Sequence, residues 1–299
     1  MNFLPILNFH GLEREKVQEP VSLVPGSVYA LPISVFSQAL REMKQAGFSC
    51  LDLKGLKGWV NNAACHDKKE KSSHPESRRT KGLRDSSLAS LSENDRKERM
   101  PQNDETPNVM LTFDDGLLSQ LEAVPLLKSF GYSAVFFVSA GWVGQPGYMS
   151  WNQLKELTRD GHTIASHGLN HLALTDLEDE KLEEEITGSK KILEDQLGVP
   201  VKAFSVPRGY LNERVHDRLK KSGYEFIFTS RFDLNVRGQD FFSLNRLAPK
   251  SKTSASEILD WLSGDLGMKK YFEKCKDMGR RWMSPAHYDS LAALKRKVS

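Results

Sequence analysis

The apolar residues near the start of the chain predict a strand, a helix and a second strand. Residues 4–9 form a short apolar run that ends at His10, which is typical of a buried strand. Between residues 32 and 47 the apolar side chains recur every three or four positions up to a glycine, which predicts a helix with a glycine stop. Residues 48–53 return to a strand-like pattern. These elements predict one structured segment over residues 1–60.

Residues 61–108 break this pattern. The stretch is rich in Lys, Arg, Ser, Glu, Asp and Asn and contains almost no large apolar side chains. Such a composition cannot bury enough apolar surface to offset the entropy lost on ordering, so we expect a disordered polar insertion. A solvated linker is the simplest interpretation, and a docking segment for a partner protein is the alternative.

Periodic apolar positions return at Val109 and continue to residue 250, so we expect the main folded core there. Alternating strands and helices indicate βαβ units, and therefore an α/β fold with a parallel sheet or barrel. Residues 251–299 predict a C-terminal helical extension. The predicted strands of the core are 109–113, 133–139, 163–166, 202–206 and 225–229. The predicted helices of core and extension are 119–130, 151–159, 179–197, 212–222 and 256–262, with Ser150 and Asn212 as the expected N-caps of the second and the fourth.

The charge balance gives no reason to expect a nucleic-acid partner. The chain has 299 residues, of which 42 are Lys or Arg and 39 are Asp or Glu, so its formal net charge is only +3. Basic residues gather near the end of the chain, at Arg280, Arg281 and residues 295–297. A solvated surface is the simplest interpretation of these residues, and attachment to an anionic membrane surface is the alternative.

The apolar runs are too short for a transmembrane segment, which requires roughly 20 residues. Residues 1–9 are apolar but lack the basic region and the cleavage site of a signal peptide, so the sequence as written predicts a cytoplasmic protein, with export by another route as the alternative. Cys50, Cys65 and Cys275 share no close spacing, which argues against a disulfide framework and against a Cys-x-x-Cys metal site.

The sequence Thr-Phe-Asp-Asp-Gly at residues 112–116 places two carboxylates, Asp114 and Asp115, directly after a predicted strand. Like charges this close disfavour double ionisation unless something positive binds beside them. A metal ion held by one carboxylate would relieve the repulsion and leave the other free as a base. An exposed turn is the alternative, because Asp-Asp-Gly also suits turns.

Two histidines, His167 and His171, follow the strand predicted at 163–166. Side chains four residues apart can point the same way, and a catalytic zinc site uses three protein ligands plus water. Together with Asp115 the two histidines complete that number of ligands, although histidines at this spacing can also be structural. His162 lies at the opposite end of the same strand, where we expect a packing role.

A third motif, Phe-Ser-Val-Pro-Arg-Gly-Tyr at residues 204–210, turns sharply at the end of another predicted strand. The backbone N–H of Arg208 in this turn could stabilise an oxyanion. An ordinary strand-to-loop turn is the alternative. The aromatic residues Trp142, Trp151 and Tyr210 could stack on sugar rings, or they could be core residues.

In order and spacing, the three motifs resemble the NodB-type polysaccharide deacetylases, carbohydrate esterase family 4. The opening at residues 4–11 resembles that of the exopolysaccharide and poly-N-acetylglucosamine subgroup. Four features depart from the family pattern. Ser205 stands where an arginine is frequent, Arg208 and Phe9 stand where tyrosine is usual, and the late Leu-x-x-His motif is not found, since His287 lies in a different context.

This resemblance implies a distorted (β/α) barrel, usually seven-stranded, with the active site at the carboxyl ends of the strands. It implies a divalent metal, with zinc as the first choice, bound by Asp115, His167 and His171. The implied substrate is an N-acetylated amino-sugar glycan. A hydrolase of another amide and a non-catalytic carbohydrate-binding homologue are the alternatives.

The implied mechanism gives each remaining motif residue a role. Asp114 takes a proton from the attacking water, whose pKa the metal lowers. The metal and the Arg208 N–H stabilise the oxyanion. His10 donates a proton to the departing amine, unless it is a structural histidine. The substrate groove is expected at Pro207, Gly209 and Tyr210.

Overall fold

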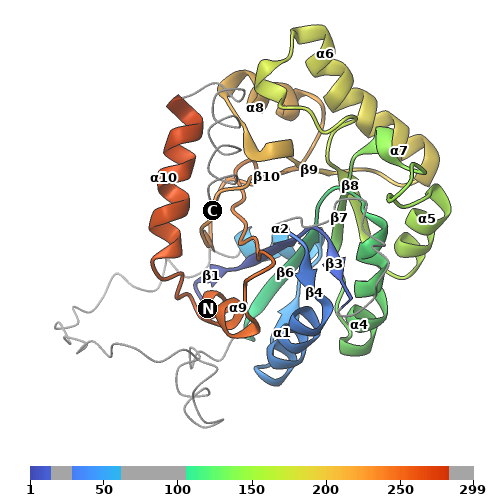
Figure 1. The fold of residues 1–299 in the computed structure, drawn as a ribbon. Coiled ribbons are helices and arrows are strands. Elements are labelled where there is room, and N and C mark those ends of the chain that lie inside the picture. Colours follow the sequence, from blue (N-terminus) through green and yellow to red (C-terminus); the bar gives the residue numbers. More distant parts are fainter. Residues whose placement is uncertain (15–28, 62–105, 283–299) are drawn as a thin grey trace, which may run out of the picture.

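Parallel strands form one curled sheet that helices surround (Figure 1). The computed structural model describes residues 1–14, 29–61 and 106–282. The sheet has seven strands in the order β10-β9-β8-β7-β6-β2, and β5 pairs with the start of β6. This arrangement confirms the predicted α/β barrel architecture. The strands are β2 (Ile6–Phe9), β5 (Ser49–Cys50), β6 (Asn108–Phe113), β7 (Val135–Val138), β8 (Thr163–Ser166), β9 (Ala203–Ser205) and β10 (Phe226–Phe228).

Two short pairs of strands accompany the main sheet. β1 (Phe3–Leu4) pairs antiparallel with β11 (Asn235–Val236), and β3 (Leu12–Glu13) pairs parallel with β4 (Leu31–Pro32). The first pair joins the start of the chain to the loop after β10, and the second follows β2 directly along the chain.

Helices cover the outside of the sheet, and two predicted N-caps are present. Ser150 and Gln153 form a capping box, and the Asn212 side chain accepts from Val215 N. None of the helices in the described ranges combines the length and apolar character of a membrane span. The helices are α1 (Ile33–Gln45), α2 (Leu53–Asn61), α4 (Ala123–Phe130), α5 (Trp151–Arg159), α6 (Asp179–Glu183), α7 (Ser189–Leu197), α8 (Glu213–Lys221), α9 (Ala255–Leu262) and α10 (Lys269–Trp282).

An irregular segment, residues 244–247, joins the two edges of the curled sheet. Leu244 N donates to Ile227 O in β10 at 3.0 Å, and Leu247 N donates to Ile6 O in β2 at 2.8 Å. Isolated parallel bridges link the same segment to β10 and β2. The segment therefore closes the seam between the first and last strands, and we call residues 244–247 the seam segment.

The inward side of the barrel is apolar at its amino end and polar at its carboxyl end. α2 packs its buried residues, Leu56 and Trp59 among them, into the interior apolar cluster and fills the amino end. Side chains two positions apart on a strand lie on the same side. The interior apolar residues Ile6, Met110, Phe137, Ala165, Ala203 and Leu244 are therefore followed on the same side by Asn8, Thr112, Ser139, His167, Ser205 and Arg246.

Two differences between the structure and the sequence predictions affect the core and the site. The strand predicted at 48–53 is only Ser49–Cys50, because Leu53 already begins α2, whose buried residues follow helical spacing. The helix predicted at 179–197 contains a π-helical turn at Glu184–Gly188 between α6 and α7. The insertion predicted at 61–108 lies outside the described residues except for its ends, where residue 61 closes α2 and residue 108 opens β6.

The apolar core between the sheet and the helices around it should account for much of the stability of the fold. Ile227 in β10 is fully buried, whereas Ile192 in α7 is 36% exposed. We expect Ile227→Ala to lower the free energy of unfolding by about 2–5 kcal/mol, through lost burial and the remaining cavity. The same truncation at Ile192 should cost about 1 kcal/mol or less. Urea unfolding of both variants measures the difference, and equal losses would contradict this view of the core.

Candidate active site

The carboxyl ends of β2, β6 and β8 bring together four residues that the sequence singles out. His10 follows β2, Asp114 and Asp115 follow β6, and His167 follows β8. β6 pairs with β2 on one side and with β7 on the other, and β7 in turn pairs with β8, so these strand ends share one edge of the sheet. The common edge explains how residues about 160 positions apart in sequence meet.

Asp115, His167 and His171 point their ligand atoms at one another. Asp115 Oδ1 lies 3.4 Å from His167 Nε2 and 3.4 Å from His171 Nε2. One ligand atom from each residue lies within 4.8 Å of the others. Asp115 Oδ1 is buried and has no hydrogen-bond partner among the described residues. A carboxylate oxygen left without a donor between two imidazole nitrogens fits a bound divalent cation.

The surroundings of the two histidines favour metal binding. The His167 ring lies 2.9 Å from Ser205 O through Nδ1, and because a carbonyl only accepts, Nδ1 carries the proton and Nε2 is left to bind a metal. Burial and the neighbouring His167 lower the pKa of His171 to about 4, so this ring is neutral near pH 7. Burial alone would lower the pKa of His167, but the carboxylates of Asp114 and Asp115 raise it overall.

Asp114 is a buried carboxylate held on both oxygens. Arg246 Nη1 donates to Oδ1 at 2.7 Å, and Arg246 Nη2 donates to Oδ2 at 2.8 Å. Asn8 Nδ2 and Ser205 Oγ also donate to Oδ2, at 3.0 and 3.3 Å. Burial raises the pKa of Asp114, but the Arg246 charge, the neighbouring His167 and the hydrogen bonds from Arg246 together outweigh burial and hold that pKa well below its usual range. Asp114 Oδ2 lies 4.0 Å from His167 Nε2, directly beside the three candidate ligands.

Arg246 is the main functional residue that the sequence analysis missed. It lies on the seam segment and is 1% exposed. Its Nε donates to Thr229 O at 3.0 Å and its Nη2 to Ser205 Oγ at 2.8 Å, in addition to the two bonds to Asp114. Ser205, which replaces the family's frequent arginine, therefore leaves room for a guanidinium from another part of the chain. The sequence signal for this residue is its position in the seam segment. Arg246 lies two positions after Leu244, on the same inward side.

The loop that carries His171 is fixed by a buried glutamate. Glu185, in the π-helical turn, is fully buried, and its carboxylate accepts from Leu169 N at 2.9 Å and from Asn170 N at 3.0 Å. The Asn170 side chain donates to the other carboxylate oxygen at 2.8 Å. A Cβ on Gly168 would lie 3.1 Å from Glu185 Oε2, and Gly168 has φ +78°, so glycine is required there. π-helical turns are frequent at functional sites.

His10 lies at the edge of this group, beside Tyr29. The two ring centroids are 4.7 Å apart, and His10 Nδ1 is buried without a hydrogen-bond partner among the described residues. The buried side chain of Gln120 donates through Nε2 to the backbone carbonyls of both His10 and Asp114. Gln120 therefore ties the end of β2 to the end of β6. His162 packs at the other end of β8, where its Nδ1 accepts from Ala134 N, as expected.

The turn at residues 207–209 packs against the histidine loop. Pro207 Cγ lies 3.5 Å from the position that a Gly168 Cβ would take. Arg208 is exposed and has φ +59°, while Pro207 and Tyr210 are buried. The groove assigned to Pro207, Gly209 and Tyr210 and the oxyanion role of Arg208 stay predictions, and burial argues against sugar stacking by Tyr210.

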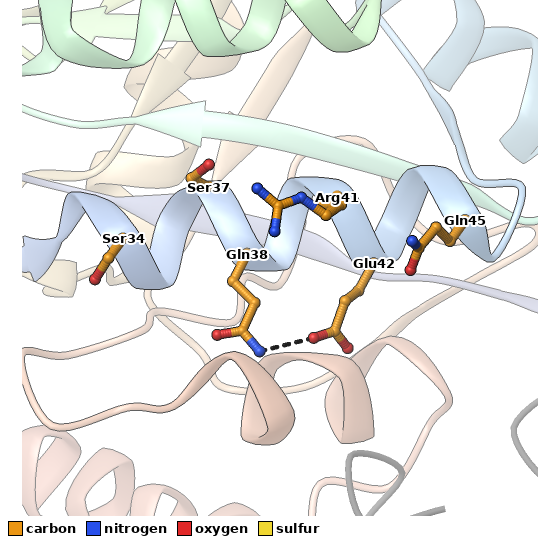
Figure 2. Close-up of a pocket in the computed structure, with 6 residues that line it drawn as sticks. All are labelled: Ser34, Ser37, Gln38, Arg41, Glu42 and Gln45. Carbon is orange, nitrogen blue, oxygen red and sulfur yellow. Dashed lines mark hydrogen bonds between the residues drawn. The ribbon is translucent and has the colours of Figure 1, made fainter. Parts of the chain in front are cut away.

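Elsewhere in the described structure, two features stand apart from this edge. A polar groove follows one face of α1 (Figure 2), and the side chains that line it include Gln38 and Glu42, which hydrogen-bond to each other at 2.9 Å. This groove contains none of the residues described above. Burial raises the pKa of Cys50 to about 12, which argues against a nucleophilic role for that thiol. Cys65 and His287 lie outside the described residues.

Comparison with known proteins supports the resemblance. Residues 102–227 match the family model for polysaccharide deacetylases. The chain is 30% identical to the Bacillus subtilis protein YxkH over 149 residues, which cover 50% of this chain and 53% of that protein. It is 33% identical to the peptidoglycan-N-acetylglucosamine deacetylase of Bacillus cereus over 132 residues, or 42% of this chain and 60% of that enzyme. The chain thus spans little more than half the length of these relatives.

Solved structures of deacetylases share the fold over most of the chain. The Streptococcus pyogenes deacetylase PplD superposes with a TM-score of 0.64 at 21% identity, covering 86% of this chain and 97% of PplD. IcaB from Ammonifex degensii superposes with a TM-score of 0.64 at 22% identity, covering 88% of this chain and 98% of IcaB. The match over residues 102–227 assigns that part of the chain to the polysaccharide deacetylases of the NodB type, carbohydrate esterase family 4, and the solved structures show that the fold extends over most of the chain.

Proposed function

We propose that this protein is a metal-dependent hydrolase that removes N-acetyl groups from an amino-sugar glycan, with zinc as the metal. The observation that carries the proposal is the convergence of Asp115, His167 and His171 beside the buried carboxylate of Asp114, within a polysaccharide deacetylase domain. The similarity to a peptidoglycan-N-acetylglucosamine deacetylase supports an N-acetylated amino sugar as the substrate class.

Asp115, His167 and His171 would hold the metal. The bound metal would act as a Lewis acid that polarises the acetyl carbonyl, and it would lower the pKa of the attacking water. Asp114 accepts the proton of the attacking water. The donors around Asp114 keep it ionised but also weaken it as a base. His10 then donates a proton to the amine as the C–N bond breaks, and acetate leaves.

The proposal predicts acetate release from N-acetylglucosamine oligomers by the zinc-loaded full chain. Asp114→Asn keeps the shape of the side chain but removes the proton acceptor, so turnover should fall about 100-fold or more. Its zinc content should stay near that of the unchanged protein, because Asp114 is not among the three ligands. Asp115→Asn, the neighbouring matched change, should lose zinc as well as activity. Acetate release and bound zinc are measured on the same samples.

The same experiment separates the alternatives. Full activity in Asp114→Asn would remove Asp114 as the base. Bound zinc without acetate release from any oligomer would overturn the proposed substrate and favour another amide or a binding role. A chain that releases acetate equally well after chelation would overturn the metal dependence.

The buried pair of Asp114 and Arg246 generates a stability prediction. Arg246→Gln leaves a buried carboxylate without its counter-charge, so the free energy of unfolding should fall by about 3–5 kcal/mol near pH 7. Arg218→Gln is the matched control, because Arg218 pairs with Glu183 at 2.6 Å while both side chains are more than a third exposed. That change should cost about 1 kcal/mol or less.

The pH dependence of this difference has a definite sign. The lowered pKa of Asp114 stabilises the native fold above the unfolded pKa of about 3.9, and this contribution is lost as the pH falls toward the folded pKa. Without Arg246 the pKa of Asp114 rises, so the stability difference between the variant and the unchanged protein should narrow below about pH 4. Urea unfolding at several pH values measures it, and a gap that widens on acidification would contradict this account.

Glu185 should control the metal site without binding the metal. Glu185→Gln replaces acceptor oxygens with an NH2 group that faces backbone donors, so the His171 loop should shift and zinc affinity should fall about 10- to 100-fold. Glu184→Gln, one residue earlier in the same π-helical turn, changes an exposed side chain and should leave the affinity unchanged. Competition with a chromophoric chelator measures both, and equal affinities would show that Glu185 only stabilises the fold.

A further inference from the structure

One face of α10 is apolar and exposed to solvent, whereas helices such as α1 and α9 bury their apolar faces. Met268, Tyr271, Phe272 and Met278 are 68%, 66%, 64% and 54% exposed. Cys275 is exposed as well. Tyr271, Phe272, Cys275 and Met278 recur at steps of three and four residues, which places them on one side of α10, and Met268 directly precedes the helix. Large apolar side chains gathered on one exposed surface mark an interaction site.

The opposite side of α10 faces the barrel and is charged. Lys269 Nζ pairs with Glu257 in α9 at 3.0 Å and lies 4.1 Å from the centroid of the Trp261 ring. Glu273 pairs with Lys250 at 2.9 Å, and Lys270 pairs with Asp233 at 2.8 Å. Figure 1 shows α10 at the periphery, beside the ring of helices. The helix is therefore held to the protein by ion pairs, and its apolar face is turned outward.

The charge of α10 indicates the chemistry of what covers this face. Residues 269–282 contain six basic and two acidic residues, a formal charge of +4, whereas the whole chain carries only +3. On a helical projection Lys274 and Lys276 flank the apolar face on its two sides, next to Met278 and Phe272 respectively. Lys276 also pairs with Glu273 at 2.7 Å and is 47% exposed. Lysines in such positions can extend toward anionic groups while the apolar side chains enter a non-polar layer.

We propose that α10 lies in the headgroup layer of an anionic lipid bilayer, with Met268, Tyr271, Phe272 and Met278 buried toward the acyl chains. An amphipathic helix with bulky apolar residues on one face and lysines beside them is the kind that binds in this layer. A second copy of the chain is a poor occupant, because two helices of charge +4 would repel each other. The proposal does not depend on the proposed enzymatic activity.

Flotation of the full-length protein with lipid vesicles tests this proposal. The protein should float with phosphatidylcholine vesicles that contain phosphatidylglycerol, bind pure phosphatidylcholine vesicles much less, and lose binding as salt is added. The double variant Tyr271→Ser/Phe272→Ser should bind the anionic vesicles with an affinity at least about tenfold lower, because two large apolar side chains no longer enter the bilayer. Ile192→Ser, on α7, is the matched control and should bind like the unchanged protein.

Other outcomes would overturn the proposal. Unchanged protein that does not float with anionic vesicles at low salt, or a double variant that floats equally well, would exclude lipid as the occupant of this face. A double variant that dissociates a dimer would assign the face to a second copy. One that unfolds at a clearly lower temperature would assign it to another segment of the same chain. Acetate release from soluble oligomers, measured in parallel, reports separately on the enzymatic proposal.

Discussion

The buried ion pair between Asp114 and Arg246 links the closure of the barrel to the assembly of the site. The two side chains are 4% and 1% exposed, so each charge would be strongly unfavourable without the other. Arg246 belongs to the seam segment that joins β10 to β2, and Asp114 follows β6 on the far side of β2. Asn8, Ser205 and Thr229 complete the hydrogen bonding of the pair. The pair therefore links the seam segment directly to the carboxyl end of β6, beside the candidate metal ligands.

Backbone strain is concentrated at the same place. Among the described residues, three other than glycine have positive φ, namely Asp115 at 78°, His171 at 55° and Arg208 at 59°. Each such conformation costs about 1–2 kcal/mol and persists only where the surroundings fix it. For His171 those surroundings include the Glu185 carboxylate, which accepts the N–H groups of the two preceding residues. The strained backbone conformations therefore lie at the candidate site and at the turn beside it.

α10 shows the reverse of the packing found in the rest of the fold. α1 and α9 bury their apolar faces in the main core, whereas α10 contacts the protein through ion pairs and leaves its apolar face outward. Among the described side chains, none from α10 belongs to the candidate site. The helix therefore lies apart from the site and is held to the rest of the fold by its charged side.

The sequence by itself determined the alternation of strands and helices, the N-caps at Ser150 and Asn212, and the three motifs that follow β6, β8 and β9. These features depend on local periodicity and on residue type, which one sequence displays directly. It also indicated the three residues whose ligand atoms the structure brings within 4.8 Å of one another.

Only the tertiary structure decided which distant groups complete the site. Arg246 binds Asp114 although 132 positions separate the two residues in sequence. Glu185 binds the His171 loop from a π-helical turn that the apolar periodicity of residues 179–197 does not predict. The same holds for α2, at the amino end of the barrel. The apolar run over residues 48–53 predicts a strand, and the short helical pattern that follows it is weaker. Contacts of this kind depend on how the sheet curls and where its seam closes, and that geometry arises from the packing of the whole chain rather than from any local pattern.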